Sequence, residues 1–184
     1  PEKISDHYKS FAKEFINNNK EFIISVLGNS TSNILHFNFG NCLLPLSFAQ
    51  ERLWFIDNYE SGSNAYNIPL LKKLVPEINL NILEKSLKSV VSRHELLHSI
   101  IKIDIDGNSY QELCDLDIMP LKISYYKVPN NKSREKLLDV QLNTVFKLSI
   151  DYPIQISIIE EEKTNTRYVL MLFHHIAFDG WSID

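Results

Sequence analysis

The chain has 184 residues, of which 44% are hydrophobic and 23% are charged, and its formal net charge is −4. This length is enough for one ordinary hydrophobic core. The scattered basic residues and the mild negative charge give no electrostatic footprint for nucleic acid binding. No apolar run is long enough to cross a membrane, and the first residues lack the apolar region of a signal peptide. Cys42 and Cys114 have neither disulfide nor zinc spacing, which predicts reduced thiols in a cytoplasmic protein.

The first part of the chain is predicted to be helical. Apolar residues recur at helical spacing over residues 4–27, and Asp6 can cap this helix. A polar stretch over 28–33 has the composition of a linker. Residues 34–39 alternate apolar and polar side chains, which fits either a strand or an extended arm. The predicted parts are a helical segment over 1–28, a linker or arm over 29–44 and a main body over 45–184.

The main body opens with a helix that carries its own start signal. Ser47 and Gln50 have the spacing of a capping box, so we expect a helix over 47–59. Residues 66–74 are apolar and predict a strand. Pro69 lies within this run, which indicates a sheet edge or a bulge because proline cannot donate to a strand ladder.

The second half alternates helices and strands. Amphipathic spacing predicts a helix over 81–98, and a second long helix is expected over 133–145. The turn Asp106-Gly107-Asn108 predicts a hairpin between its flanking apolar segments. The expected strands after residue 99 are 100–105, 110–113, 121–125, 153–160 and 166–173, the last two as a hairpin. This mixture predicts an α+β fold with the helices packed on one face of a sheet.

The strongest chemical signal is the segment His174-His175-Ile176-Ala177-Phe178-Asp179-Gly180, which follows an apolar strand. Side chains alternate along a strand, so the two histidines should point to opposite faces and should not share a metal ion. Asp179 can brace the following turn, and Gly180 lets backbone amides approach a substrate. A histidine after a strand is commonly a hydrogen-bonded core residue, although its usual pKa of about 6.5 also suits proton transfer. The residues alone leave the structural and the catalytic interpretation open.

Several segments in order along 45–184 resemble the condensation domains of nonribosomal peptide synthetases. Residues 174–182 (HHIAFDGWS) are similar to the active-site motif of that family. The other matching segments are 46–54 (LSFAQERLW), 66–69 (YNIP), 93–97 (RHELL) and, more loosely, 145–148 (VFKL). The resemblance implies two subdomains similar to chloramphenicol acetyltransferase, each with helices on a mixed sheet, and an active site between them. This chain would supply only the N-terminal subdomain.

The resemblance also implies an activity, in secondary-metabolite or antibiotic biosynthesis. The parent protein would join a donor acyl or peptidyl thioester to the amine of an acceptor aminoacyl thioester and so form an amide bond. Both substrates would be carried on phosphopantetheine, with no directly bound cofactor and no metal. The implied partners are donor and acceptor peptidyl carrier proteins, the C-terminal condensation subdomain, an adjoining adenylation domain and an upstream synthetase subunit. The fragment alone is expected to be inactive.

The family motif assigns roles to four residues by position. His175 is the expected catalytic residue, which would either accept the amine proton or hold the amine in line. Gly180 would offer its backbone amide to the tetrahedral species. His174 is expected to be structural. Asp179 would pair with an arginine of the other subdomain, and without that arginine it would be a solvated turn residue.

Arg93 matches an arginine of the second family motif, where it would support the active-site loop. A solvated cation at a helix end is the simpler interpretation of the same residue. The family usually has another arginine five positions later. Here that position is His98, which puts a shared arginine network in doubt.

Other functions within this superfamily involve related motifs. An epimerisation domain shares the histidine motif but has a different opening motif. A heterocyclisation domain is excluded because it replaces the histidines with aspartates, and a noncatalytic recruiting relative usually has a damaged motif. Residues 1–28 weakly resemble the closing helices of a docking domain, and a plain linker helix is the alternative.

Overall fold

The computed structural model describes residues 44–59 and 62–183. The expected helix over 4–27 and the strand or arm over 34–39 lie outside these residues, which all belong to one compact unit, residues 41–184. The elements in chain order are β1 (Leu44–Pro45), α3 (Phe48–Tyr59), β2 (Asn67–Lys73), α4 (Leu80–Arg93), η1 (Glu95–His98), β3 (Ser99–Ile103), β4 (Ser109–Leu113), β5 (Ile123–Val128), α5 (Asn131–Leu142), β6 (Ile154–Glu161), β7 (Thr166–His174) and η2 (Gly180–Ile183).

The strands form two sheets, of order β2-β7-β6-β5 and β1-β4-β3. In the larger sheet β7 runs antiparallel to both of its neighbours, whereas β5 and β6 are parallel. A parallel pair needs a long connection, and α5 supplies it. Pro69 lies on the edge strand β2, as its missing N–H predicted. The sheet is therefore mixed, and the strand that ends in His174 lies inside it.

Two helix ends show where local sequence signals held and where one failed. The capping box of α3 forms as expected: Ser47 N–H donates to Gln50 Oε1 at 2.9 Å, and Gln50 N–H donates to Ser47 Oγ at 3.3 Å. The helix predicted over 81–98 is shorter. His94 leaves the helical conformation, with φ −114° and ψ 89°, so α4 ends before it and η1 follows.

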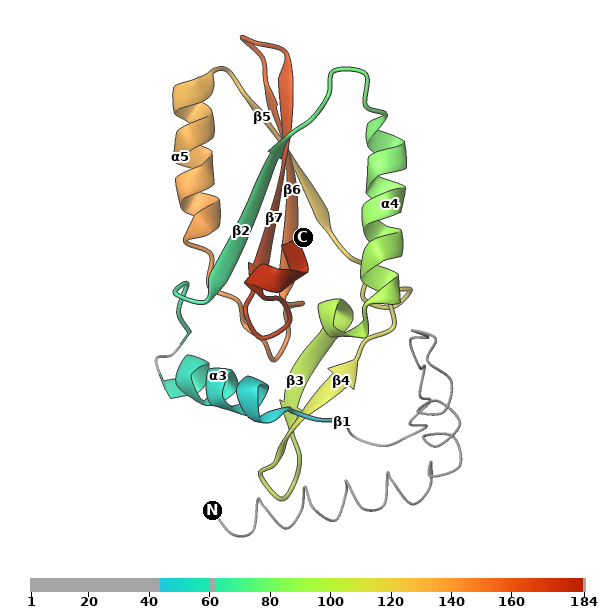
Figure 1. The fold of residues 1–184 in the computed structure, drawn as a ribbon, viewed down its shortest axis with the longest axis vertical. Helices are drawn as coiled ribbons and strands as arrows, with labels where there is room; N and C mark the ends of the chain where they lie inside the picture. Colours follow the sequence, from blue (N-terminus) through green and yellow to red (C-terminus); the bar gives the residue numbers. More distant parts are fainter. Residues whose placement is uncertain (1–43, 60–61, 184) are drawn as a thin grey trace. The chain divides into compact units, whose positions relative to one another are not determined.

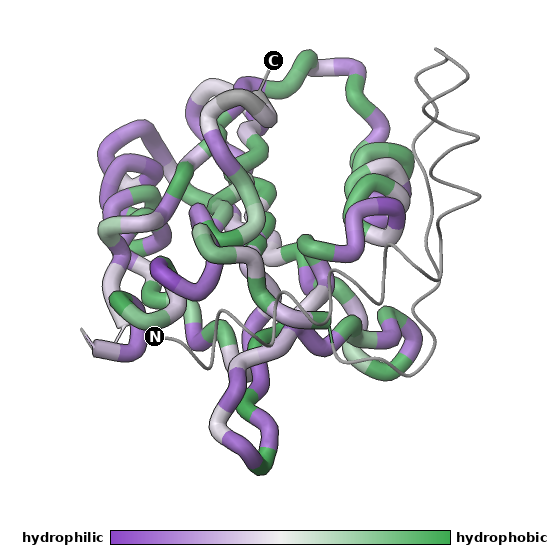
Figure 2. The backbone as a smooth tube through the Cα atoms, turned by 60° about the horizontal axis from the view of Figure 1, so that its bottom comes forward, coloured by the Kyte–Doolittle hydropathy of each residue, from purple (hydrophilic) through white to green (hydrophobic). Residues whose placement is uncertain are grey.

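Helices α4 and α5 pack on opposite faces of the larger sheet, which corrects the expectation that the helices share one face (Figure 1). On β6, Ile156 packs in the core cluster that contains Val91 of α4. The alternate residues Gln155 and Ser157 donate to the side chain of Gln141 on α5. The first turns of α5 are hydrophilic (Figure 2). Because polar side chains attach α5 to the sheet, the spacing of its apolar residues did not indicate which face of the sheet it covers.

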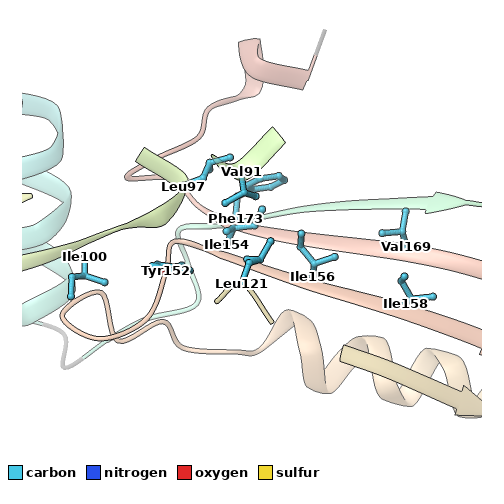
Figure 3. Packing of buried hydrophobic residues seen from close by; sticks show 10 residues of the cluster. All are labelled: Val91, Leu97, Ile100, Leu121, Tyr152, Ile154, Ile156, Ile158, Val169 and Phe173. Carbon is cyan, nitrogen blue, oxygen red and sulfur yellow. The ribbon is translucent and has the colours of Figure 1, made fainter. Parts of the chain in front are cut away.

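The apolar core is divided into two clusters of buried side chains. The larger cluster (Figure 3) is packed by Leu80, Leu83 and Leu87 of α4 and consists of Val91, Leu97, Ile100, Leu121, Tyr152, Ile154, Ile156, Ile158, Val169 and Phe173. The smaller, here called the turn cluster, consists of Leu46, Trp54, Ile101, Phe146, Leu148, Leu172 and Ile176. Each large apolar side chain so buried contributes about 1.5–3 kcal/mol before entropic costs. The turn cluster joins α3 to the residue that follows the two histidines.

No helix in the described part of the chain is long and apolar enough to cross a bilayer.

Candidate active site

The end of β7 separates the two histidines, as strand alternation predicted. His174 is the last residue of β7 and its side chain is fully buried. Its ring lies between those of Tyr66 and Phe146, with centroids 6.2 and 6.0 Å away. His175 begins the following turn and is exposed. Within 44–59 and 62–183, no three acidic, histidine or cysteine side chains are placed to hold a metal ion.

His174 has a buried imidazole that is neutral near pH 7. Its Nδ1 accepts a hydrogen bond from the Ile176 N–H at 3.1 Å, so the ring proton resides on Nε2. Nε2 lies 4.0 Å from Oδ1 of Asp57, a buried residue of α3. This carboxylate favours the charged ring, but burial and then the neighbouring His175 lower the pKa of His174 to about 4. At neutral pH the ring therefore carries no charge and faces Asp57 with its N–H.

His175 is held so that one ring nitrogen is available. Its backbone N–H donates to the Tyr66 carbonyl at 2.9 Å, and its ring Nδ1 lies 2.9 Å from the Phe178 carbonyl oxygen. A carbonyl oxygen only accepts, so the neutral ring must carry its proton on Nδ1. The lone pair is then on Nε2. This geometry gives the exposed side chain a proton acceptor at a defined position.

Asp179 and Gly180 shape the end of the turn. Asp179 Oδ1 accepts from the Ser182 N–H at 3.0 Å and from the Ser182 hydroxyl at 2.7 Å, so this carboxylate caps η2. It braces the turn, as the sequence predicted. Gly180 is the first residue of η2, and its φ lies outside the left-handed region. A Cβ added to it would meet no described atom within 4 Å. Among the described residues nothing local requires glycine here, and its missing side chain leaves open space beside the turn.

Two residues of α3 contact the end of β7 or the turn that follows it, although their sequence positions predicted no such role. Gln50 was expected only as a capping residue, yet its Nε2 donates to the Ile176 carbonyl at 3.2 Å. Asp57 was not selected at all, and it faces His174. The one sequence signal for this contact was the Nε2 group of Gln50, because a capping box uses only the side-chain oxygen of a glutamine.

The structure does not join Arg93 to the histidine turn by a contact. Arg93 is exposed in the last turn of α4, and its guanidinium group forms no ion pair or hydrogen bond within the described ranges. His98 is buried, and its Nδ1 lies 3.0 Å from the Cys114 carbonyl oxygen, to which it donates. His98 therefore ties η1 to the end of β4, and among the described residues it has no arginine partner. A supporting role for Arg93 stays a prediction.

Comparison with known proteins identifies the family. The family model described as "Condensation domain" matches residues 42–184, and the chain belongs to this family. It is 36% identical over 143 residues to the probable non-canonical nonribosomal peptide synthetase CymA of Salinispora arenicola. It is 33% identical over 143 residues to a dimodular nonribosomal peptide synthase of Bacillus subtilis. These matches cover 77% and 76% of this chain but only 2% and 6% of the two relatives.

Solved structures show the same fold. The first condensation domain of the calcium-dependent antibiotic synthetase matches with a TM-score of 0.68 at 17% identity, over 78% of this chain and 35% of that one. The starter condensation domain of the rhizomide synthetase RzmA matches with a TM-score of 0.66 at 16% identity, over 77% and 36%. The predicted family and the predicted α+β fold are therefore confirmed, and the chain spans about a third of each solved protein.

Proposed function

We propose that this chain carries the catalytic histidine of an amide-forming condensation domain of a nonribosomal peptide synthetase. The acceptor would be the α-amine of an aminoacyl thioester, and the donor an acyl or peptidyl thioester. The single observation that carries this proposal is the bond from His175 Nδ1 to the Phe178 carbonyl, which leaves Nε2 free to accept a proton in an exposed turn.

The chemistry needs little from the protein beyond one base and correct placement. The amine nitrogen attacks the thioester carbonyl carbon, a tetrahedral species forms, and the C–S bond breaks as the amide is made. His175 Nε2 takes the proton that the amine loses, and the departing thiolate takes it up. An α-amine has a pKa of roughly 7.7–8.0 and is partly neutral near pH 7, so His175 can also act by holding the amine in line. Such positioning alone removes several kcal/mol from a barrier.

Two further residues have proposed roles in this reaction. The open space beside Gly180 suits the approach of the tetrahedral species to its backbone amide. Asp179 already caps η2 with one oxygen, so an arginine of a second subdomain would reinforce a turn that is braced from within. His174 is proposed to be structural because its ring is buried and both ring nitrogens face protein groups.

The proposal includes partners that this chain does not contain. Peptidyl carrier proteins would present both substrates on phosphopantetheine, and a second condensation subdomain would form the other wall of the cleft. In the solved condensation domain with a TM-score of 0.68, this chain matches 35% of the length. We therefore propose that residues 1–184 do not catalyse condensation alone. The same proposal includes contacts with an adenylation domain and with an upstream synthetase subunit.

The test follows the mass of the loaded acceptor carrier after mixing with a loaded donor carrier and the protein that carries this chain. Wild type is expected to add the mass of the donor acyl group, and His175→Ala to lose this transfer. His94→Ala is the matched control, since it removes another exposed histidine. Transfer that survives His175→Ala would reject the catalytic role of His175. No transfer by wild type, with folded protein and loaded carriers, would favour a noncatalytic recruiting domain, and inversion of a bound residue would favour an epimerisation domain.

A further inference from the structure

We propose that Gln50 is a positioning residue for His175 and that it acts through the carbonyl group of Ile176. This inference rests on the proposed catalytic role of His175. In the opening motif, Gln50 would then link helix α3 to the active-site turn as well as cap the helix. Asp57, on the same face of α3, lies beside His174, whose Nδ1 accepts the Ile176 N–H.

One face of α3 lies against Ile176 and the neighbouring His174. Gln50, Trp54 and Asp57 stand at positions i, i+4 and i+7, which share a helix face. Gln50 Nε2 donates to the Ile176 carbonyl at 3.2 Å. Trp54 and the Ile176 side chain are both buried in the turn cluster. Asp57 Oδ1 lies 4.0 Å from Nε2 of His174, whose Nδ1 accepts the Ile176 N–H.

These contacts fix the peptide groups on either side of one residue. The Ile176 N–H belongs to the peptide that follows His175, and the Ile176 carbonyl belongs to the next one. With both held, the turn can bring the Phe178 carbonyl to His175 Nδ1 in a constant orientation. On the other side of His175, the Tyr66 carbonyl holds its backbone N–H. The direction of the His175 Nε2 lone pair therefore depends on α3 as well as on Tyr66, which directly precedes β2.

The oxygen and the nitrogen of the Gln50 side-chain amide have separate hydrogen-bonding roles. Oε1 accepts from the Ser47 N–H at 2.9 Å in the capping box, whereas Nε2 donates to Ile176. Nε2 also lies 3.5 Å from the side-chain oxygen of Gln111 on β4. Glutamate at position 50 would keep the capping acceptor and lose the donor. Lysine would keep a donor and lose the acceptor.

This separation defines the experiment, in the protein that carries this chain and with loaded carrier proteins. Gln50→Glu is expected to lower kcat by roughly 10- to 100-fold while KM for the loaded acceptor carrier stays within about twofold, because the loss lies in orientation. Gln50→Lys should recover most of the lost rate. Ser47→Ala is the matched control. It removes the cap, should lower Tm by a few degrees and should leave kcat within about twofold.

A spectroscopic measurement tests the same inference without any activity. Nitrogen NMR of labelled histidine distinguishes a proton on Nδ1 from one on Nε2. We expect His175 to be protonated on Nδ1 in wild type and in Ser47→Ala, and to shift towards Nε2 protonation in Gln50→Glu. Gln50→Met, which is uncharged and of similar volume, replaces Gln50→Glu if the carboxylate prevents folding.

The outcomes separate this inference from the proposed function. If wild type forms the amide and Gln50→Glu does so at the same rate, the positioning role is overturned and the function stands. An equal loss of kcat in Ser47→Ala and Gln50→Glu would also overturn it, since helix capping would then explain both. If wild type forms no amide, the proposed function fails, and an unchanged His175 spectrum in Gln50→Glu would reject the positioning role separately.

Discussion

Arg134 on α5 forms a largely buried ion pair with Glu161 at the end of β6. Its Nη1 lies 2.6 Å from Glu161 Oε2, and the two side chains are 17% and 3% exposed. The same guanidinium donates to the Tyr168 hydroxyl at 2.6 Å, and its Cζ lies 4.3 Å from the centre of that ring. This group of polar contacts holds a rather hydrophilic helix on one face of the larger sheet.

Replacing the arginine should be far more damaging than breaking an exposed pair. Arg134→Ala leaves the buried carboxylate of Glu161 without its cation, so we expect the free energy of unfolding to fall by about 3–5 kcal/mol. Lys88→Ala is the control, since Lys88 and Glu84 pair at 2.7 Å with side chains 48% and 30% exposed. It should change stability by less than about 0.5 kcal/mol. Urea unfolding of the three proteins measures both values, and similar losses in the two variants would contradict the prediction.

Two glycines with the same backbone conformation provide a second matched pair. Gly62 and Gly107 both have φ +85°. A Cβ at position 62 would lie 2.6 Å from Cγ1 of Val145, whereas a Cβ at position 107 would meet nothing within 4 Å. Gly107→Ala should therefore lower the free energy of unfolding only by the cost of placing alanine in the left-handed conformation, about 1–2 kcal/mol. Gly62→Ala should cost about 1–3 kcal/mol more because the β-branched Val145 is stiff. Thermal unfolding measures both losses of stability. Equal losses in the two variants would contradict the prediction, because the Val145 side chain would then move aside without an energetic cost.

The buried ring of His174 should make stability depend on pH. Burial, then the nearby His175, lower its pKa from 6.5 to about 4 in the folded state, so the unfolded state binds the proton first as pH falls. The free energy of unfolding should then decrease from pH 6.5 towards pH 4, by up to about 1.4 kcal/mol per pH unit. His174→Asn should lose this slope, and the exposed control His94→Asn should keep it. Urea unfolding of the three proteins at several pH values measures how the free energy of unfolding changes with pH. Equal slopes for wild type and His174→Asn would refute the prediction.

Tyr152 should give the opposite trend in alkaline solution. Burial, with smaller contributions from Cys114 and Asp115, raises its pKa from 10 to about 12. Between these values the unfolded chain loses the phenolic proton and the folded chain keeps it, so stability should fall as pH rises. Tyr152→Phe should remove this trend. It should also cost about 1 kcal/mol at pH 7, because the hydroxyl donates to the Met119 carbonyl at 2.6 Å. An absorbance titration that showed Tyr152 ionising near pH 10 would contradict the assignment.

Short-range signals predicted much of the fold. The Ser47 and Gln50 spacing predicted the start of α3, and the turn at Gly107 predicted the β3–β4 hairpin. In both cases, the local structure is determined by interactions between residues that are only a few positions apart in the sequence. Alternation along β7 likewise predicted that His174 and His175 would separate. The proposed catalytic role of His175 came from resemblance to the family, since the residues alone left a structural histidine equally open.

Long-range contacts account for what the sequence could not predict. Gln50 and Ile176 lie 126 positions apart, and no periodicity relates them. The face covered by α5 depends on Gln141 and Arg134, whose polar side chains resemble those of any solvated helix until their partners on β6 are known. His94 interrupts a helix whose apolar spacing continues, and Leu97 of the following η1 is buried in the larger core cluster.

The pairing of β2 with β7 also constrains how the chain must be made. Asn67 pairs with His174 and Lys73 with Tyr168, so β2 finds its partner only when nearly all of the described chain is available. Closing such a distant pair is slow, and an unpaired apolar strand is prone to aggregate while it waits. During synthesis on the ribosome, β2 must remain without this neighbour until β7 emerges. The strand that ends in His174 is thus also the last strand of the sheet to be synthesised, and a shortened version of this domain without it would leave an open sheet edge.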